Sequence, residues 1–224
     1  MISALIFDFD GVLIESEWVG NAQIAEWLSA AGHPTTTRQA LDAFTGLSGR
    51  DFTDAIERWI DGPLPAGFAE ARAVQDAQCM ADGVDAVLGA VAFVRALPPT
   101  LPRAVASSSS SAWIRRHLDH IGLGDGFGDM IFSGREHVSR GKPAPDIYLH
   151  AAAALDVPIG DCVIIEDSLV GVTGALASGA RVIGLAAGRH CDARHVDALR
   201  ARGVTEIAAD FEELAALLAL DALA

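Results

Sequence analysis

Two aspartates, Asp8 and Asp10, follow the apolar run 4–7 and precede Gly11. Residues two apart on an extended chain point the same way, so we expect their carboxylates to crowd together. Crowded like charges push one pKa upward unless a cation intervenes. The pair suits a reaction in which Asp8, ionised and metal-bound, attacks phosphorus while Asp10 transfers a proton. Gly11 permits a turn that brings backbone close to a ligand. The alternative is an Asp-rich strand end that merely caps the next helix.

A second acidic pair, Glu166 and Asp167, follows the apolar run 163–165. If both pairs meet, four carboxylates would need a hard divalent cation, and oxygen-rich ligand sets favour Mg²⁺. The alternative is an exposed helix cap at Asp167 or Ser168.

Polar groups at two further places could bind an anion. Ser107 offers a hydroxyl and Ser108 a backbone amide, although the serine run 107–111 could simply begin the next helix. Lys142 supplies a compact positive charge that could hold a nucleophile and an anion together. Taken singly, a lysine before proline is more often a solvated turn residue.

Apolar runs and helical patterns alternate along most of the chain. Strands are expected at 4–7, 103–106, 130–132, 162–165 and 181–185, and helices at 112–121, 147–155, 171–178 and 211–220. This alternation predicts an α/β fold with a doubly wound parallel sheet. Ligands bind such sheets beyond the carboxyl ends of the strands, where the polar groups above are placed.

The stretch from Trp18 to Met80 lacks strand patterns and instead predicts helices at 19–31, 38–44, 51–60 and 66–80. We therefore expect a helical cap domain at 17–81, inserted into a core domain formed by 1–16 and 82–224.

The composition narrows the function. The 224 residues are 51% hydrophobic and carry 30 acidic against 16 basic side chains, a formal net charge of -14. Such a chain can bury a core, and its acidity argues against nucleic acid as a partner. Apolar runs are too short for a membrane span and the start does not resemble a signal peptide, so a cytoplasmic protein is expected. The three cysteines predict neither a disulfide framework nor a zinc cluster, and monomer and homodimer remain open.

Four motifs in this order resemble the haloacid dehalogenase superfamily of phosphohydrolases. They are Asp8-Phe9-Asp10-Gly11-Val12, Ala106-Ser107-Ser108, Gly141-Lys142-Pro143-Ala144-Pro145-Asp146 and Ile165-Glu166-Asp167-Ser168. The likeness covers almost the whole chain, and the helical insertion falls where that family carries a small α-helical cap. Within the superfamily the chain looks most like sugar-phosphate phosphatases and β-phosphoglucomutase.

The resemblance implies a role for each matching residue. Asp8 would be the phospho-aspartyl nucleophile and Asp10 the general acid and base. Mg²⁺ would be held by Asp8, the backbone carbonyl of Asp10 and Asp167, with Glu166 as a ligand or an outer partner. Ser107 and Lys142 would bind the transferring phosphoryl group. The substrate would be a small phosphate ester, and the reaction its hydrolysis.

Departures from the family pattern favour a phosphatase over a mutase. In β-phosphoglucomutase the cap loop carries Gly-x-Ser-Arg, whereas the loop that begins at Gly46 places Gly49 where that arginine would fall and Arg50 one position later. Gly20 stands where the mutase has histidine, and Glu15 replaces the more usual aspartate. Gly46 and Arg50 remain candidates for contacting the substrate. A phosphosugar mutase is the alternative, and a non-catalytic phospho-ligand sensor a third.

Two histidine pairs fall outside these motifs. His117 and His120 are three apart on a predicted helix, and we expect them on its exposed face. His190 and His195 follow the last predicted core strand and are expected at the surface, with a position near the site entrance as the alternative.

Overall fold

The computed structural model describes residues 2–45, 47 and 49–219. Its backbone contacts divide the chain into two compact units, Met1–Glu15 with Asp85–Ala224, and Ser16–Val84. The sequence placed the insertion at 17–81. In the described residues, no helix is long and apolar enough to cross a membrane.

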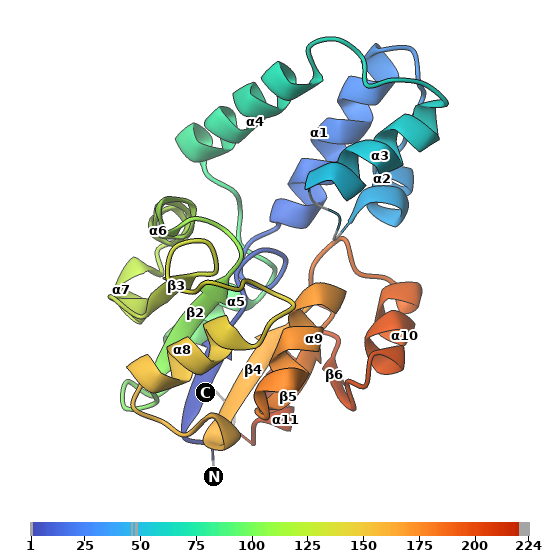
Figure 1. The fold of residues 1–224 in the computed structure, drawn as a ribbon. Helices are drawn as coiled ribbons and strands as arrows, with labels where there is room; N and C mark the ends of the chain where they lie inside the picture. Colours follow the sequence, from blue (N-terminus) through green and yellow to red (C-terminus); the bar gives the residue numbers. More distant parts are fainter. Residues whose placement is uncertain (1, 46, 48, 220–224) are drawn as a thin grey trace. The chain divides into compact units, whose positions relative to one another are not determined.

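The larger unit is built on a six-stranded sheet in which every described pair of strands is parallel, in the order β3-β2-β1-β4-β5-β6 (Figure 1). This confirms the predicted doubly wound α/β fold. The strands are β1 (Ala4–Phe7), β2 (Arg103–Ser107), β3 (Ile131–Ser133), β4 (Cys162–Glu166), β5 (Arg181–Leu185) and β6 (Glu206–Ala208). The sequence missed β6, an edge strand of three residues of which Ala208 alone is buried.

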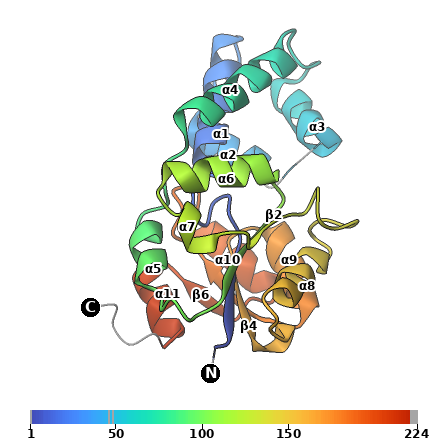
Figure 2. The ribbon, with the colours of Figure 1, turned by 90° about the vertical axis from the view of Figure 1, so that its left-hand side faces the viewer.

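Helices cover both faces of this sheet. Figure 2 shows α5 and α11 on one side of it and α8 and α9 on the other. The helices of this unit are α5 (Ala90–Ala96), α6 (Ser111–His120), α7 (Gly124–Phe127), α8 (Asp146–Ala154), α9 (Leu169–Ser178), α10 (Ala193–Ala201) and α11 (Phe211–Leu217), with a 3-10 turn at Ile159–Asp161. The sequence did not predict α5, α7 or α10.

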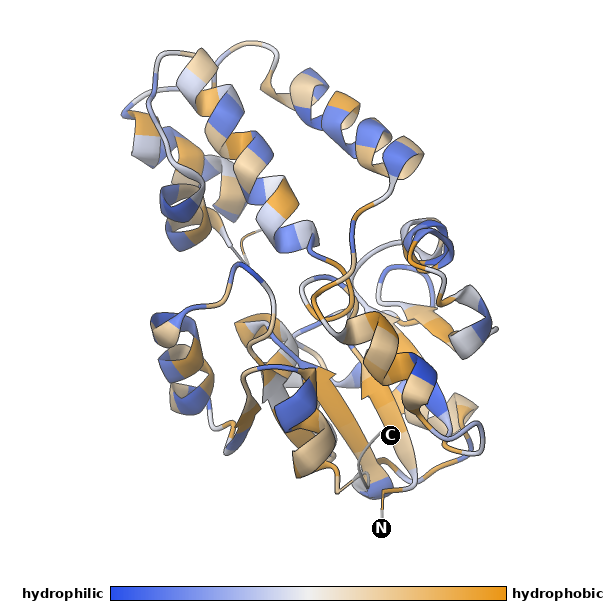
Figure 3. Cartoon of the chain, turned by 180° about the vertical axis from the view of Figure 1, so that it is seen from behind, coloured by the Kyte–Doolittle hydropathy of each residue, from blue (hydrophilic) through white to orange (hydrophobic). Residues whose placement is uncertain are grey.

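Alternating residues of β1 enter two different cores. Ala4 and Ile6 pack with Tyr148 of α8 and with residues of α9. Phe7 faces the other side, where its ring meets Phe93 and Phe127 edge to face. Because both faces are covered, the middle residues of the central strands are apolar, and much of their length is orange in Figure 3, whereas β2 ends in Ser107 and β4 ends in Glu166.

The smaller unit is all helical over its described residues. It contains α1 (Ser16–Ala30), α2 (Thr37–Phe44), α3 (Gly49–Ile60) and α4 (Phe68–Asp82). A capping box at Thr36 and Gln39 begins α2. The unit has its own core, in which Leu28, Phe44 and Ile56 are buried.

Candidate active site

The carboxyl ends of β1, β2 and β4 meet at one edge of the sheet. Phe7 of β1 is in register with Val105 on one side and Ile165 on the other. Asp8 therefore follows β1 between Ser107, the last residue of β2, and Glu166, the last residue of β4. The parallel register thus brings together three segments that lie far apart in the sequence.

Lys142 joins two of these strand ends. Its Nζ donates to Asp8 Oδ1 at 2.7 Å and to Glu166 Oε1 at 2.6 Å. The Lys142 side chain is 3% exposed, so this lysine is not a solvated turn residue. It is a buried cation held against the carboxylate of Asp8.

Glu166 is saturated with hydrogen bonds. Its Oε1 also accepts from the Tyr148 hydroxyl at 2.8 Å, and its Oε2 accepts from the backbone N–H and the hydroxyl of Ser168 at 2.8 and 3.0 Å. Gly171 fits here because a Cβ at that position would collide with the Glu166 carboxylate. With four donors on its two oxygens, Glu166 is better placed to orient Lys142 than to bind a metal directly.

Asp167, the next residue, has a polar contact at only one of its two carboxylate oxygens in the described structure. Its Oδ2 lies 2.8 Å from His190 Nε2, and the two side chains are 2% and 1% exposed. Its Oδ1 is buried and has no hydrogen-bond partner among the described residues. Gly11, at φ +81°, leaves room for this carboxylate, because a Cβ there would collide with Asp167 Oδ2.

Burial and mutual repulsion control the charges of these groups. Burial raises the pKa of Asp8 well above its ordinary value, and the charge of Glu166 raises it further, against the opposing effect of Lys142. Burial and Glu166 likewise raise the pKa of Asp167 well above the usual range. Burial also acts on Glu166, but the Lys142 charge and the hydrogen bonds outweigh it and lower that pKa.

This acidic cluster, defined as Asp8, Glu166 and Asp167, has the composition of a cation site. One carboxylate oxygen from each residue lies within 4.8 Å of the others. Three buried carboxylates face one ammonium, and the bare Asp167 Oδ1 is an oxygen donor without a partner in the described structure. The residues present therefore fit a hard divalent cation such as Mg²⁺.

The Asp10 carboxylate is held elsewhere. Its Oδ2 accepts from the hydroxyls of Ser109 and Ser107 at 2.6 and 3.2 Å, and its Oδ1 accepts from the Trp113 indole N–H at 3.1 Å. Asp10 is not among the three residues of the acidic cluster, although its charge contributes to raising the pKa of Asp167. β1 ends at Phe7, and the alternation of side chains that predicted crowding holds only on an extended chain.

The serines of the run 107–111 have different environments and different hydrogen-bond partners. Ser107 is buried, and its hydroxyl accepts from the Ser109 N–H at 2.9 Å while donating to Asp10. Ser108 is exposed. The N-cap of α6 is Ser110, whose hydroxyl accepts from Trp113 N–H. Helix capping and proximity to the site are thus properties of different serines.

Two candidates for substrate contact belong to the smaller unit. Arg50 lies in the first turn of α3, where its side chain is 91% exposed and 3.8 Å from Asp54. Gly46 lies outside the described residues.

One member of each histidine pair is buried against expectation, whereas His120 is exposed as expected and His195 is half-buried. His190 is 3% exposed and bonded to Asp167, and His117 is fully buried with Nδ1 2.8 Å from the carbonyl of Trp113. The sequence analysis also missed Tyr148, Ser109 and Trp113. The rule that sites lie beyond strand ends could have found His190, because the segment after β5 opens at the same edge.

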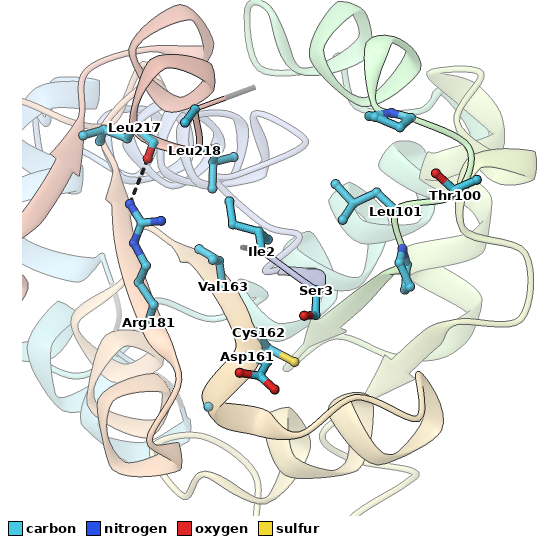
Figure 4. A pocket seen from close by; sticks show the side chains of 14 residues that line it. Ile2, Ser3, Thr100, Leu101, Asp161, Cys162, Val163, Arg181, Leu217 and Leu218 are labelled. Atoms are coloured by element: carbon cyan, nitrogen blue, oxygen red, sulfur yellow. Dashed lines mark hydrogen bonds between the residues drawn. The ribbon is translucent and has the colours of Figure 1, made fainter. Parts of the chain in front are cut away.

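A separate pocket of about 820 Å³ lies at the opposite edge of the sheet. Figure 4 shows Ser3, Cys162 and Arg181 around it, from the amino ends of β1, β4 and β5, with Arg181 donating to the Leu217 carbonyl at 2.8 Å. Since the strands are parallel, this pocket is remote from the acidic cluster.

Fold and cluster together define an α/β enzyme with buried carboxylates at the carboxyl edge of a parallel sheet. Residues 2–179 match the family model described as haloacid dehalogenase-like hydrolase. The chain belongs to this hydrolase family, as its four motifs predicted.

Curated relatives of known activity are phosphatases. Hexitol phosphatase A of Escherichia coli is 30% identical over 181 residues, which cover 80% of each chain. The bifunctional riboflavin kinase/FMN phosphatase of Arabidopsis thaliana is 32% identical over 187 residues, or 81% of this chain. The matched part is 48% of the plant protein, so the chain spans about half the length of that relative.

Solved structures of the same family superpose over nearly the whole chain. A haloacid dehalogenase-like protein of unknown function from Agrobacterium tumefaciens is 31% identical with a TM-score of 0.89, covering 98% of this chain and 99% of its own. A family hydrolase from Deinococcus radiodurans, solved with bound phosphate and sodium, is 31% identical with a TM-score of 0.86 and covers 99% and 97%.

Proposed function

We propose that this hydrolase is a Mg²⁺-dependent phosphatase that cleaves small, sugar-like phosphomonoesters through a phospho-aspartyl intermediate on Asp8. One observation carries the proposal: the Asp8 carboxylate is buried against Lys142 and lies beside Asp167, which has a bare oxygen. Asp8 can attack phosphorus as a nucleophile, and Lys142 provides a positive charge beside it. Asp167 Oδ1 can bind a metal ion that would offset the charge of a phosphate dianion. The phosphatase activity of its relatives supports the same chemistry.

We propose a role for each of these side chains. An Asp8 oxygen forms a bond to phosphorus as the ester oxygen leaves, and Asp10 gives that oxygen its proton. Asp10 then takes a proton from water, which attacks phosphorus and releases Asp8. Lys142 and the Ser107 hydroxyl face the phosphoryl oxygens, together with the backbone at Gly11 and Ser108.

Asp8 and Asp167, with the backbone carbonyl of Asp10, would hold the metal. The chemistry that Mg²⁺ would supply there is positive charge, which would offset the charges of Asp8, of the phosphate and of the transition state. Glu166 acts from outside, because its four hydrogen bonds fix it against Lys142. For the part of the substrate that is not transferred, we propose contacts with Gly46 and with Arg50 of α3.

The relatives indicate which phosphate esters to compare as substrates. The hexitol phosphatase among the relatives favours the phosphate ester of a sugar-like alcohol. The FMN phosphatase is the reason to test flavin and nucleotide esters as well.

The test is a phosphate-release screen with Mg²⁺ over sugar phosphates, nucleotides and phosphoglycolate. We expect turnover of at least one sugar phosphate, its loss in Asp8→Asn with the circular dichroism spectrum unchanged, and reversible loss in EDTA. Full activity of Asp8→Asn, or in EDTA, contradicts the mechanism. Conversion of a hexose 1-phosphate that needs a bisphosphate primer and releases little phosphate would instead identify a mutase. No turnover of any ester would indicate a sensor.

A further inference from the structure

Two histidines, one in a loop and one in the helix that follows it, contact the side chain and the backbone of Asp167. The loop 186–192 joins β5 to α10, and His190 Nε2 lies 2.8 Å from Asp167 Oδ2. His195, in the first turn of α10, places its Nε2 2.7 Å from the Asp167 backbone carbonyl oxygen. The side chain and the main chain of the same residue are therefore both fixed by imidazole groups.

The loop is anchored to hold His190 in this place. The backbone N–H of Arg189 donates to the buried Glu15 carboxylate at 3.1 and 3.3 Å, and the Cys191 N–H closes a turn on the Gly188 carbonyl at 2.9 Å. Asp192 caps α10 by accepting from the His195 N–H at 3.0 Å. Both histidines thus come from a segment that is fixed at its start and at its end.

Two glycines make room for the His190 ring. A Cβ on Gly188 would lie 2.6 Å from His190 Cε1, and a Cβ on Gly11 would lie 3.0 Å from the same atom. Gly11 belongs to the first motif and Gly188 to the loop after β5. The His190 ring therefore occupies the space that the missing side chains of Gly11 and Gly188 leave open beside Asp167.

We propose that His190 is a positioning residue that donates its Nε2 hydrogen to Asp167 Oδ2 and so turns the bare Oδ1 toward the metal. The inference rests on the metal site proposed above. Carboxylate ligands of metals are themselves held by hydrogen bonds, and loss of such an outer partner typically weakens metal affinity about 10- to 100-fold. His195 supports the same residue through its backbone.

A metal bound by the histidines themselves fits less well. Ligand atoms of His190, Cys191 and His195 also lie within 4.8 Å of one another. Both imidazole Nε2 atoms already contact Asp167, however, and burial raises the pKa of the Cys191 thiol well above its ordinary value. A protonated thiol and two occupied nitrogens make a poor ligand set.

The test measures Mn²⁺ binding by electron paramagnetic resonance, without substrate, in two variants of similar volume. His190→Gln keeps an amide N–H near the position of Nε2, whereas His190→Leu removes the donor. We expect His190→Leu to bind Mn²⁺ about 10- to 100-fold more weakly than the wild type and His190→Gln to keep most of the affinity. His150→Ala, which removes a half-buried ring that packs on Phe132, serves as the control.

The possible outcomes distinguish the proposed metal site from the proposed role of His190. Wild-type protein that binds no Mn²⁺ would refute the metal site itself. If the wild type binds and a folded His190→Leu binds equally well, the role of His190 is refuted while the metal site stands. Should His190→Leu fail to fold, His190→Asn replaces it, since its amide is one methylene shorter than that of glutamine. Equal affinity of the Asn, Gln and wild-type proteins then overturns the inference.

Discussion

Lys142 can be tested by separating its effect on stability from its effect on catalysis. Its ammonium is 3% exposed and lies 2.7 and 2.6 Å from two buried carboxylates. Lys142→Met leaves Asp8 and Glu166 without their counter-charge. Removing one partner of a buried ion pair costs about 3–5 kcal/mol, so we expect the free energy of unfolding to fall by that amount. Urea unfolding followed by circular dichroism measures the change.

Adding Glu166→Gln to Lys142→Met should restore more than half of this loss. The amide is neutral, its oxygen can accept from the Ser168 N–H, and its NH₂ group can donate to the Tyr148 hydroxyl. Phosphate release should stay reduced by at least about 10²-fold in both variants, because the cation that faces the phosphoryl group is absent from each. Glu166→Gln alone is the control for the amide. Recovery of activity together with stability in the double variant would refute a direct role for Lys142.

Two further predictions concern hydrogen bonds inside and outside the site. Ser109→Ala removes the 2.6 Å bond to Asp10, and we expect kcat to fall about tenfold with KM little changed, whereas Ser110→Ala should cost about 1 kcal/mol of helix capping and leave kcat intact. Equal kcat losses in the two variants would contradict this. The bonds from Arg181 lower the pKa of Glu206 below its ordinary 4.5, so the pair stabilises the fold above that pH and loses its effect as pH falls below it. Urea unfolding should show a deficit below about 1 kcal/mol for Glu206→Gln at pH 7 that shrinks below pH 4.5, and a deficit that persists at pH 3 would exclude a charge effect.

The strand ends could be predicted from the sequence because a pattern of consecutive residues marks each of them. A short apolar run followed by Asp8, by Ser107 or by Glu166 marks both the strand and its carboxyl end, and a parallel sheet then brings these ends to one edge. The partners of these residues could not be predicted in the same way. Tyr148 reaches Glu166 because α8 packs on the same sheet face, and no spacing rule connects positions 18 apart.

The chain around Asp10 departs from the extended geometry that the spacing argument assumed. The rule that residues two apart share a side applies while the chain is extended, but β1 ends at Phe7 and Gly11 turns with φ +81°. The Asp10 carboxylate accepts hydrogen bonds from Ser109 and Trp113. His190 was misplaced for a different reason: a histidine in a polar loop resembles a surface residue until a carboxylate contact is known.

Two adjacent acids in one motif need not share one function. Glu166, the last residue of β4, accepts four hydrogen bonds and leaves little capacity for another ligand. Asp167 lies beyond the strand end, and one of its oxygens has no partner among the described residues. A divalent cation would therefore meet Asp167 and Asp8 before Glu166, and the charge of Glu166 would act on the site through Lys142. The three carboxylates of the acidic cluster thus divide into one, Glu166, that fixes Lys142, and two, Asp8 and Asp167, that are placed to receive a cation from solution.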